Sequence, residues 1–128
     1  MKTIKVFHAL PMSGYTDEEI KSRLESEDSE IRMLIGSDVN VEIIHPHMDP
    51  ITDENLLKEL KTENLYYFGL SLSEGISKAD IVIFGYDWWK ARGCQVEEFI
   101  CQLYGIPYVE LNDIESSIKL KSLINQIS

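Results

Sequence analysis

The chain has 128 residues, 44% of them hydrophobic and 27% charged, which is enough to bury the core of one domain spanning residues 1–128. Its net charge of -10 argues against the basic surface that a nucleic acid polymer needs. No apolar run approaches the length of a membrane span. We therefore expect neither a nucleic acid nor a membrane as a partner.

The first residues and the cysteines both point to the cytoplasm. Residues 1–5 alternate in polarity and do not form the long apolar segment of a secretory signal. Cys94 and Cys101 are seven positions apart on one predicted helix, too far apart for a mutual disulfide. Reduced thiols are typical of a cytoplasmic protein.

The N-terminal part predicts a strand, a helix and a second strand. Residues 2–9 alternate in polarity and end in a turn-rich loop. Thr16 and Glu19 have the spacing of a capping box, which opens a helix that we extend to about Leu34. The middle of this helix, residues 25–30, is polar enough to be a candidate break.

The second predicted strand, residues 41–44, ends in His45-Pro46-His47. Two histidines with one residue between them suggest a metal pair. The sequence locates no third ligand, so we favour a polar loop and expect neither a metal ion nor a cofactor.

The C-terminal part continues the alternation of helices and strands. Thr52 and Thr62 are predicted to cap the first two helices, and the apolar run at residues 80–84 is predicted to be a central strand. The predicted elements are helices at 53–60 and 62–78, a strand at 80–84, a helix at 94–104, a strand at 106–111 and a helix over 114–127.

This alternation predicts an α/β fold, a three-layer αβα sandwich of the flavodoxin or Rossmann type with a parallel sheet of four to five strands. Loops 10–15 and 85–93 would then flank one cleft at the carboxyl ends of the strands, where such folds bind ligands.

Helix 94–104 carries the main candidate for chemistry. At 100° per residue, an apolar stripe is predicted to face the sheet, with Glu97 at its flank and Glu98 pointing into solvent. A carboxylate held there suits a nucleophile or a general base. Alternatively, Glu97 is an ordinary acidic residue near a helix N-terminus. The stripe consists of Val96, Phe99, Ile100 and Leu103.

Segments along the chain resemble the nucleoside 2-deoxyribosyltransferase-like superfamily, in particular a branch of small uncharacterised bacterial and phage proteins. Residues 9–14 read Ala-Leu-Pro-Met-Ser-Gly, residues 79–80 read Ala-Asp, residues 88–97 read Trp-Trp-Lys-Ala-Arg-Gly-Cys-Gln-Val-Glu, and residues 104–107 read Tyr-Gly-Ile-Pro. Their order and spacing agree along most of the chain. The resemblance implies cleavage or transfer of an N-glycosidic bond in a (deoxy)nucleoside or nucleoside 5'-monophosphate by a homo-oligomer, a dimer or larger.

The resemblance also assigns roles. Glu97 occupies the position of the family's nucleophile, which attacks the anomeric carbon to form a glycosyl-enzyme intermediate. Trp88 would cover the base. Four residues would hold a 5'-phosphate through backbone amides or a guanidinium, namely Ser13, Gly14, Arg92 and Gly93.

Several positions depart from the family pattern. Phe7 and Leu10 belong to the predicted substrate site, but they stand where the family has a tyrosine and a glycine. Leu72 stands where active members carry an aspartate that assists the departing base, and Ala91 replaces a serine. These departures weaken the prediction of turnover more than the prediction of the fold.

Two other functions remain open. One is a catalytically inactive nucleotide-binding or protein-interaction module on the same fold, with Trp88 and Trp89 as an interaction patch. The other is an activity like that of an NAD glycohydrolase, because residues 94–97 resemble the Cys-x-x-Glu motif of TIR-type enzymes.

Overall fold

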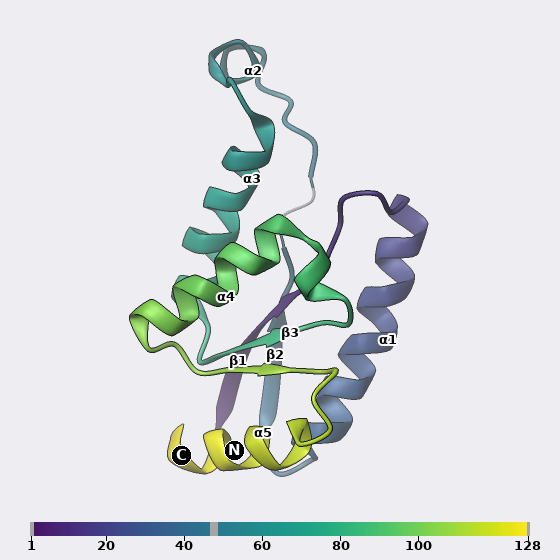
Figure 1. The fold of residues 1–128 in the computed structure, drawn as a ribbon, viewed down its shortest axis with the longest axis vertical. Coiled ribbons are helices and arrows are strands. Elements are labelled where there is room, and N and C mark those ends of the chain that lie inside the picture. The colour runs from purple at the N-terminus through teal and green to yellow at the C-terminus, as the bar shows by residue number, and fades with distance from the viewer. Residues whose placement is uncertain (1, 47–48, 128) are drawn as a thin grey trace.

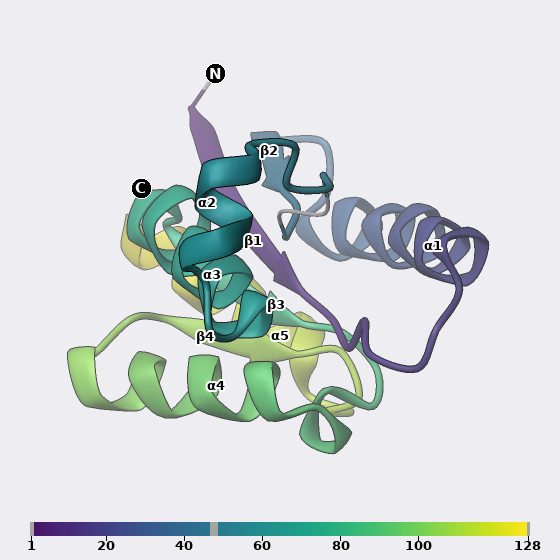
Figure 2. The ribbon, with the colours of Figure 1, turned by 90° about the horizontal axis from the view of Figure 1, so that it is seen from above.

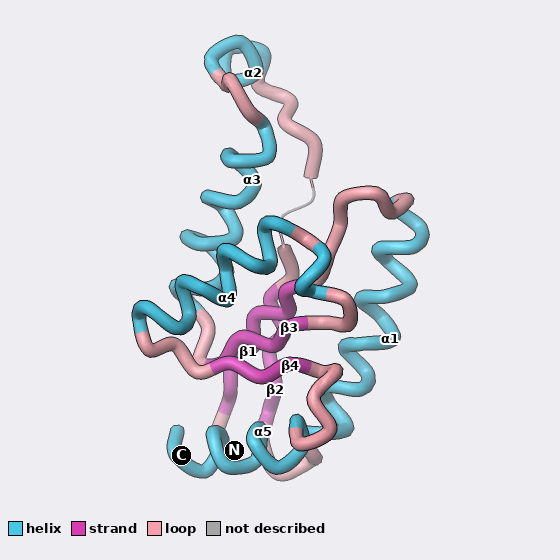
Figure 3. The backbone as a smooth tube through the Cα atoms, in the orientation of Figure 1, coloured by secondary structure: helices cyan, strands magenta, loops and turns pink. Residues whose placement is uncertain are grey.

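A parallel β-sheet forms the centre of the computed structural model, which describes residues 2–46 and 49–127. Its four strands are arranged in the order β2-β1-β3-β4 (Figure 1, Figure 3). They comprise β1 (Thr3–Ala9), β2 (Asn40–Ile44), β3 (Ile81–Phe84) and β4 (Tyr108–Glu110). The parallel sheet predicted from the alternating pattern is thereby confirmed.

Helices connect the strands and cover both faces of the sheet, as the view from above shows (Figure 2). Helices α1 and α5 pack on one face, where Ile4 and Val6 of β1 meet Ile31 and Leu120. The segment after α3, together with α4, packs on the other face. The helices are α1 (Asp17–Ile35), α2 (Glu54–Glu59), α3 (Glu63–Leu70), α4 (Arg92–Tyr104) and α5 (Ser116–Ile127). This is the predicted three-layer αβα sandwich.

Strand β3 is one of the two interior strands of the sheet, as its continuous apolar run predicts. All four of its residues are buried, with alternate side chains contributing to the two cores. Strand β4 is shorter than the predicted 106–111. Over the part of the chain that is described, no helix combines the length and apolar character needed to cross a membrane.

Helix α1 confirms the predicted helix and lacks the candidate break. It runs without a break through its polar middle, because Glu27 and Asp28 there are held by histidines of the sheet layer. The Thr16–Glu19 capping box is present as predicted, with both reciprocal hydrogen bonds.

The caps and extent of the next two helices also differ from prediction. Asp53, not Thr52, caps α2 through hydrogen bonds to the amides of Asn55 and Leu56. Thr62 precedes α3 but makes no side-chain cap bond. The predicted helix 62–78 is not one regular helix, since α3 passes into a π-helical turn (Ser71–Gly75) and a 3₁₀ turn (Ile76–Lys78).

Helix α4 faces the sheet with a different side from the one predicted. Cys94, Glu97 and Cys101 are buried, whereas Val96 is 45%, Phe99 56% and Leu103 65% exposed. The helix starts at Arg92, one residue after a 3₁₀ turn (Trp88–Lys90), and its buried residues have helical spacing but form a different stripe from the predicted one. Glu98 is half-buried rather than free in solvent, with Tyr108 donating a hydrogen bond to it. Three further large apolar side chains are exposed: Leu65, Ile114 and Ile118.

Candidate functional site

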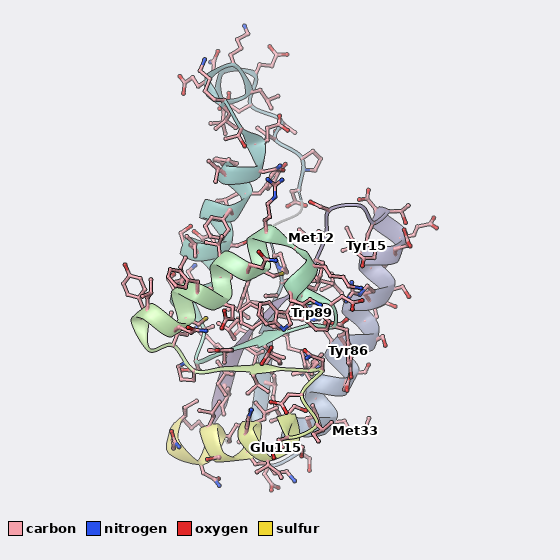
Figure 4. The ribbon with its side chains drawn as sticks, in the orientation of Figure 1. Met12, Tyr15, Met33, Tyr86, Trp89 and Glu115 are labelled. Atoms are coloured by element: carbon pink, nitrogen blue, oxygen red, sulfur yellow. The ribbon has the colours of Figure 1, made fainter. Side chains whose placement is uncertain are left out.

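Two loops meet at the carboxyl edge of the sheet. Strands β1 and β3 are neighbours and run parallel, so the loops that follow them emerge at the same end. Figure 4 shows Met12 and Tyr15 on the loop after β1, and Tyr86 and Trp89 on the loop after β3. Helix α4 follows directly from the second loop, so its N-terminal half belongs to this edge.

Glu97 lies on the buried face of α4 and is only 6% exposed. Within residues 2–46 and 49–127 its carboxylate has no hydrogen-bond or ion-pair partner, and burial is the one influence on its pKa. Burial raises the pKa of Glu97 to about 8, because an apolar surrounding disfavours the charged form. The structure thus holds a largely neutral carboxyl group at the position that the sequence selects for chemistry.

Cysteines flank Glu97 on the same helix face. Burial, followed by the charge of Glu97, raises the pKa of Cys94 to about 12 and that of Cys101 to about 12. Both thiols are free, buried and neutral, as expected for reduced cysteines. Two charged residues of α1 also influence the pKa of Cys94: the positive charge of Arg23 lowers it and the negative charge of Glu27 raises it.

The residues predicted to hold a phosphate lie on open backbone. Ser13, Gly14, Arg92 and Gly93 are all exposed. Gly14 has φ +86°, a conformation that favours glycine. A Cβ atom added at Gly14 or Gly93 would meet no atom within 4 Å, so a ligand can approach both backbones.

Trp88 is half-buried and fixed in place. Its Nε1 donates a hydrogen bond of 2.9 Å to Glu110 Oε1, and its ring centroid is 5.1 Å from that of Phe84. Trp89, next to it, is 44% exposed. Of the two tryptophans, Trp89 therefore offers the larger free surface.

Phe7, Leu10 and Leu72 contribute to packing. Phe7 is fully buried, and a Cβ atom added at Gly75 would lie 2.4 Å from its ring. Leu10 is 4% exposed and packs with Ile20 and Leu24 of α1. Leu72 is partly buried against the α4-side core.

A second cluster, centred on His8, lies under the same edge. His8 is fully buried on β1, with Nδ1 2.8 Å from Asp28 Oδ1 and Nε2 2.8 Å from Glu27 Oε1. His45, just after β2, places Nε2 2.7 Å from Asp28 Oδ2. Burial lowers the pKa of His8, but hydrogen bonds to Asp28 and Glu27 outweigh it and leave that pKa raised.

Arg23 connects this cluster to the surface. One guanidinium nitrogen, Nη2, donates to Glu27 Oε2 at 3.1 Å and to the backbone carbonyl of Tyr86. The guanidinium carbon lies 5.2 Å from the centroid of the Tyr15 ring. The other nitrogen, Nη1, is buried without a hydrogen-bond partner among the described residues. The residues around a surface hollow of about 360 Å³ are Tyr15, Glu18, Glu19, Ser22 and Arg23.

Gly85, the first residue after β3, lies against the Glu27 carboxylate. A Cβ atom added there would be 2.1 Å from Glu27 Oε1, closer than any real contact. The absence of a side chain at this position therefore gives the carboxylate room to reach His8.

Sequence reasoning missed His8, Glu27, Asp28 and Arg23 as members of a site. One signal was available, because Glu27 occupies the buried stripe of α1 formed by Ile20, Leu24 and Ile31. A carboxylate at such a position needs a partner. The sequence does not indicate that this partner is on β1. His47 of the predicted metal pair lies outside the described residues.

Comparisons with protein-family models, with curated proteins and with solved structures give no match to this chain.

Proposed function

We propose that the protein cleaves or transfers the N-glycosidic bond of a (deoxy)nucleoside or nucleoside 5'-monophosphate, with Glu97 as the nucleophile. The observation that carries this proposal is Glu97, a residue only 6% exposed, whose carboxylate has no hydrogen-bond partner among the described residues. It lies on the first turns of α4, after the loop at the carboxyl end of β3. A buried acid whose pKa is raised by burial is characteristic of a functional group.

In the proposed reaction, a Glu97 oxygen attacks the anomeric carbon of the sugar. The C–N bond breaks, its electron pair goes to the base nitrogen, and water supplies the proton for the departing base, since position 72 carries no acid. Water or a second base then takes the sugar from the glycosyl ester. The neutral surroundings of Glu97 strengthen its attraction to the positive charge that develops on the sugar.

Arg23 adds a binding group to those predicted from the sequence. Its buried Nη1 lacks a partner among the described side chains, and a phosphate or hydroxyl oxygen of the substrate would satisfy it. The exposed amides of Ser13, Gly14 and Gly93 lie on the loops at the same edge. Trp88 or the more exposed Trp89 would stack on the base.

The test is release of free base from a panel of ribo- and deoxyribonucleosides and their 5'-monophosphates, followed by chromatography. We expect release by the unaltered protein and a loss of about 10³-fold or more in Glu97→Gln, because the amide cannot form the ester. Glu98→Gln is the matched control, since Glu98 is the adjacent acid and an amide oxygen can still accept from Tyr108. No release above an enzyme-free blank, or equal rates for Glu97→Gln and the control, contradicts the proposal.

A second candidate is a nucleotide-binding module without chemistry. It is favoured by the hollow lined by Tyr15 and Arg23, which does not include Glu97. The buried Nη1 of the same arginine also lacks a hydrogen-bond partner among the described residues. In that case a nucleotide raises the melting temperature without being consumed, and Arg23→Met removes the effect whereas Glu97→Gln does not.

The remaining expectations accompany this proposal. We propose a cytoplasmic homo-oligomer that acts on small molecules and not on nucleic acid polymers. The outward apolar side of α4, with Val96, Phe99 and Leu103, is compatible with subunit contact.

A further inference from the structure

The cluster around His8 has the composition and spacing of a metal site. Three elements contribute: β1 with His8, α1 with Asp28, and the segment after β2 with His45. One potential ligand atom from each of these residues lies within 4.8 Å of the other two. Among the described residues this is the group whose nitrogen and oxygen atoms converge in this way.

The spacing fits a small ion. In a tetrahedral site with bonds of about 2.1 Å, neighbouring ligand atoms are about 3.4 Å apart. The Asp28 oxygens are now 2.8 Å from His8 Nδ1 and 2.7 Å from His45 Nε2, which is hydrogen-bond spacing. If the Asp28 oxygens and the two histidine nitrogens moved apart by several tenths of an ångström, a metal ion could replace the hydrogen-bonding protons between them.

The surroundings of His8 support this assignment independently. A histidine that binds a metal through one ring nitrogen almost always donates from the other nitrogen to a carboxylate or carbonyl. Glu27 Oε1 lies 2.8 Å from His8 Nε2, and Arg23 in turn holds Glu27 Oε2 at 3.1 Å. This carboxylate fixes the ring with Nδ1 toward Asp28.

The three residues of the cluster differ in their exposure to solvent. His8 is fully buried, Asp28 is 20% exposed at its side chain, and His45 is 41% exposed. An ion can therefore approach from the His45 side. The net charge of -10 also favours a cation near the surface.

We propose that His8 Nδ1, a carboxylate oxygen of Asp28 and His45 Nε2 bind one divalent transition-metal ion of the Zn²⁺ type. Two imidazoles and one carboxylate are the donor set that such ions prefer over Mg²⁺ or Ca²⁺. With three protein ligands, one coordination position stays open to water on the exposed side. Glu27 is a positioning residue that acts through His8.

The test is isothermal titration of ZnCl₂ into tag-free protein that has been stripped with EDTA and dialysed. We expect one ion per chain. His45→Ala and Asp28→Asn should each weaken binding by about tenfold or more, and Glu27→Gln by about 10- to 100-fold through loss of the ring's second hydrogen bond. His45 is the primary variant because it lies on a loop with an exposed side chain, so its removal leaves the core intact.

Asp38→Asn is the matched control, because Asp38 is an exposed acid in the turn before β2. The Zn²⁺ affinity of this variant should equal that of the unaltered protein. Thermal unfolding without metal verifies that each variant folds. Absence of binding heat with up to 1 mM of Zn²⁺, Co²⁺ or Ni²⁺ overturns the proposal. Binding that survives His45→Ala unchanged also overturns it, because the ion would then be held elsewhere, for example by the thiols of Cys94 and Cys101.

Discussion

A carboxyl group that is 6% exposed and has no partner in the described structure stays neutral at a pH where surface carboxyls are charged. Glu97 therefore destabilises the folded state whenever it must ionise. Natural proteins retain such groups mainly where a reaction or a ligand uses them. The residue can be tested by stability as well as by activity.

We predict that Glu97→Gln stabilises the protein above neutral pH. The pKa rises from 4.5 in the unfolded chain to about 8 in the folded protein, so folding binds a proton between these values. The contribution of Glu97 to the free energy of unfolding is therefore constant below pH 4.5, falls as the pH rises toward 8, and then levels off. Glu97→Gln lacks this loss and should be more stable by roughly 2–4 kcal/mol at pH 8, measured by urea unfolding.

Glu25→Gln serves as the control, because Glu25 is an exposed acid on α1 and its removal should leave the pH profile unchanged. A difference between Glu97→Gln and the unaltered protein that does not grow between pH 5 and pH 8 would show that the carboxyl group is not buried as described.

The pH dependence of base release distinguishes the role of the same residue. With a pKa of about 8, roughly one Glu97 in ten is ionised at pH 7. A nucleophile must be ionised, so we predict that kcat/KM rises about tenfold per pH unit below pH 7.5 and levels off above pH 8. A rate that falls over this range would identify Glu97 as a proton donor instead.

At the scale of single elements, the helix caps offer a direct comparison. We predict that Thr16→Ala lowers the free energy of unfolding by about 1 kcal/mol, because the capping box satisfies amides at the start of α1. Thr52→Ala is the matched control, since Asp53 caps α2 and Thr52 does not. Chemical denaturation of both variants measures the difference. An equal loss for Thr52→Ala would contradict the observed caps.

Sequence patterns predicted the elements better than their orientations. Alternating polarity and continuous apolar runs depend on local burial, so β1, β3 and the capped start of α1 could be located. The side of α4 that faces the sheet was not predicted, because its buried residues Cys94, Glu97 and Cys101 include a carboxylate and no large apolar side chain. Its exposed Val96, Phe99 and Leu103 therefore misled the prediction, whereas the position of Glu97 was still selected.

At the scale of the whole molecule, the excess of negative charge should cost stability. The chain carries 22 acidic and 12 basic residues, so its surface repels itself. We predict that raising NaCl from 20 to 300 mM at pH 7.5 increases the melting temperature by about 2–5 °C, because salt shortens the range of repulsion. Near pH 5, close to the isoelectric point of about 4.6, the same salt step should have little effect. An equal rise at both pH values would exclude charge repulsion as the cause.

The assembly of the His8 cluster is also a property of the whole fold. Its members come from β1, α1 and the end of β2, and their side chains meet only when the strand order and the rotation of α1 are fixed. The sequence pattern alone predicts neither the strand order nor the rotation of α1. For the same reason the sequence favours a polar loop at His45 and does not connect this residue with His8 on a distant strand.

Gly85 takes no part in the hydrogen bonds of the His8 cluster, but its lack of a side chain leaves the space that the Glu27 carboxylate occupies. A single methyl group at that position would push the Glu27 acid off the imidazole while every donor and acceptor atom stays in the protein. Steric crowding alone would then remove one of the two contacts that orient the His8 ring and displace the Arg23 guanidinium that contacts Glu27. The size of the residue at the turn after β3 thus determines the geometry of side chains on β1 and α1.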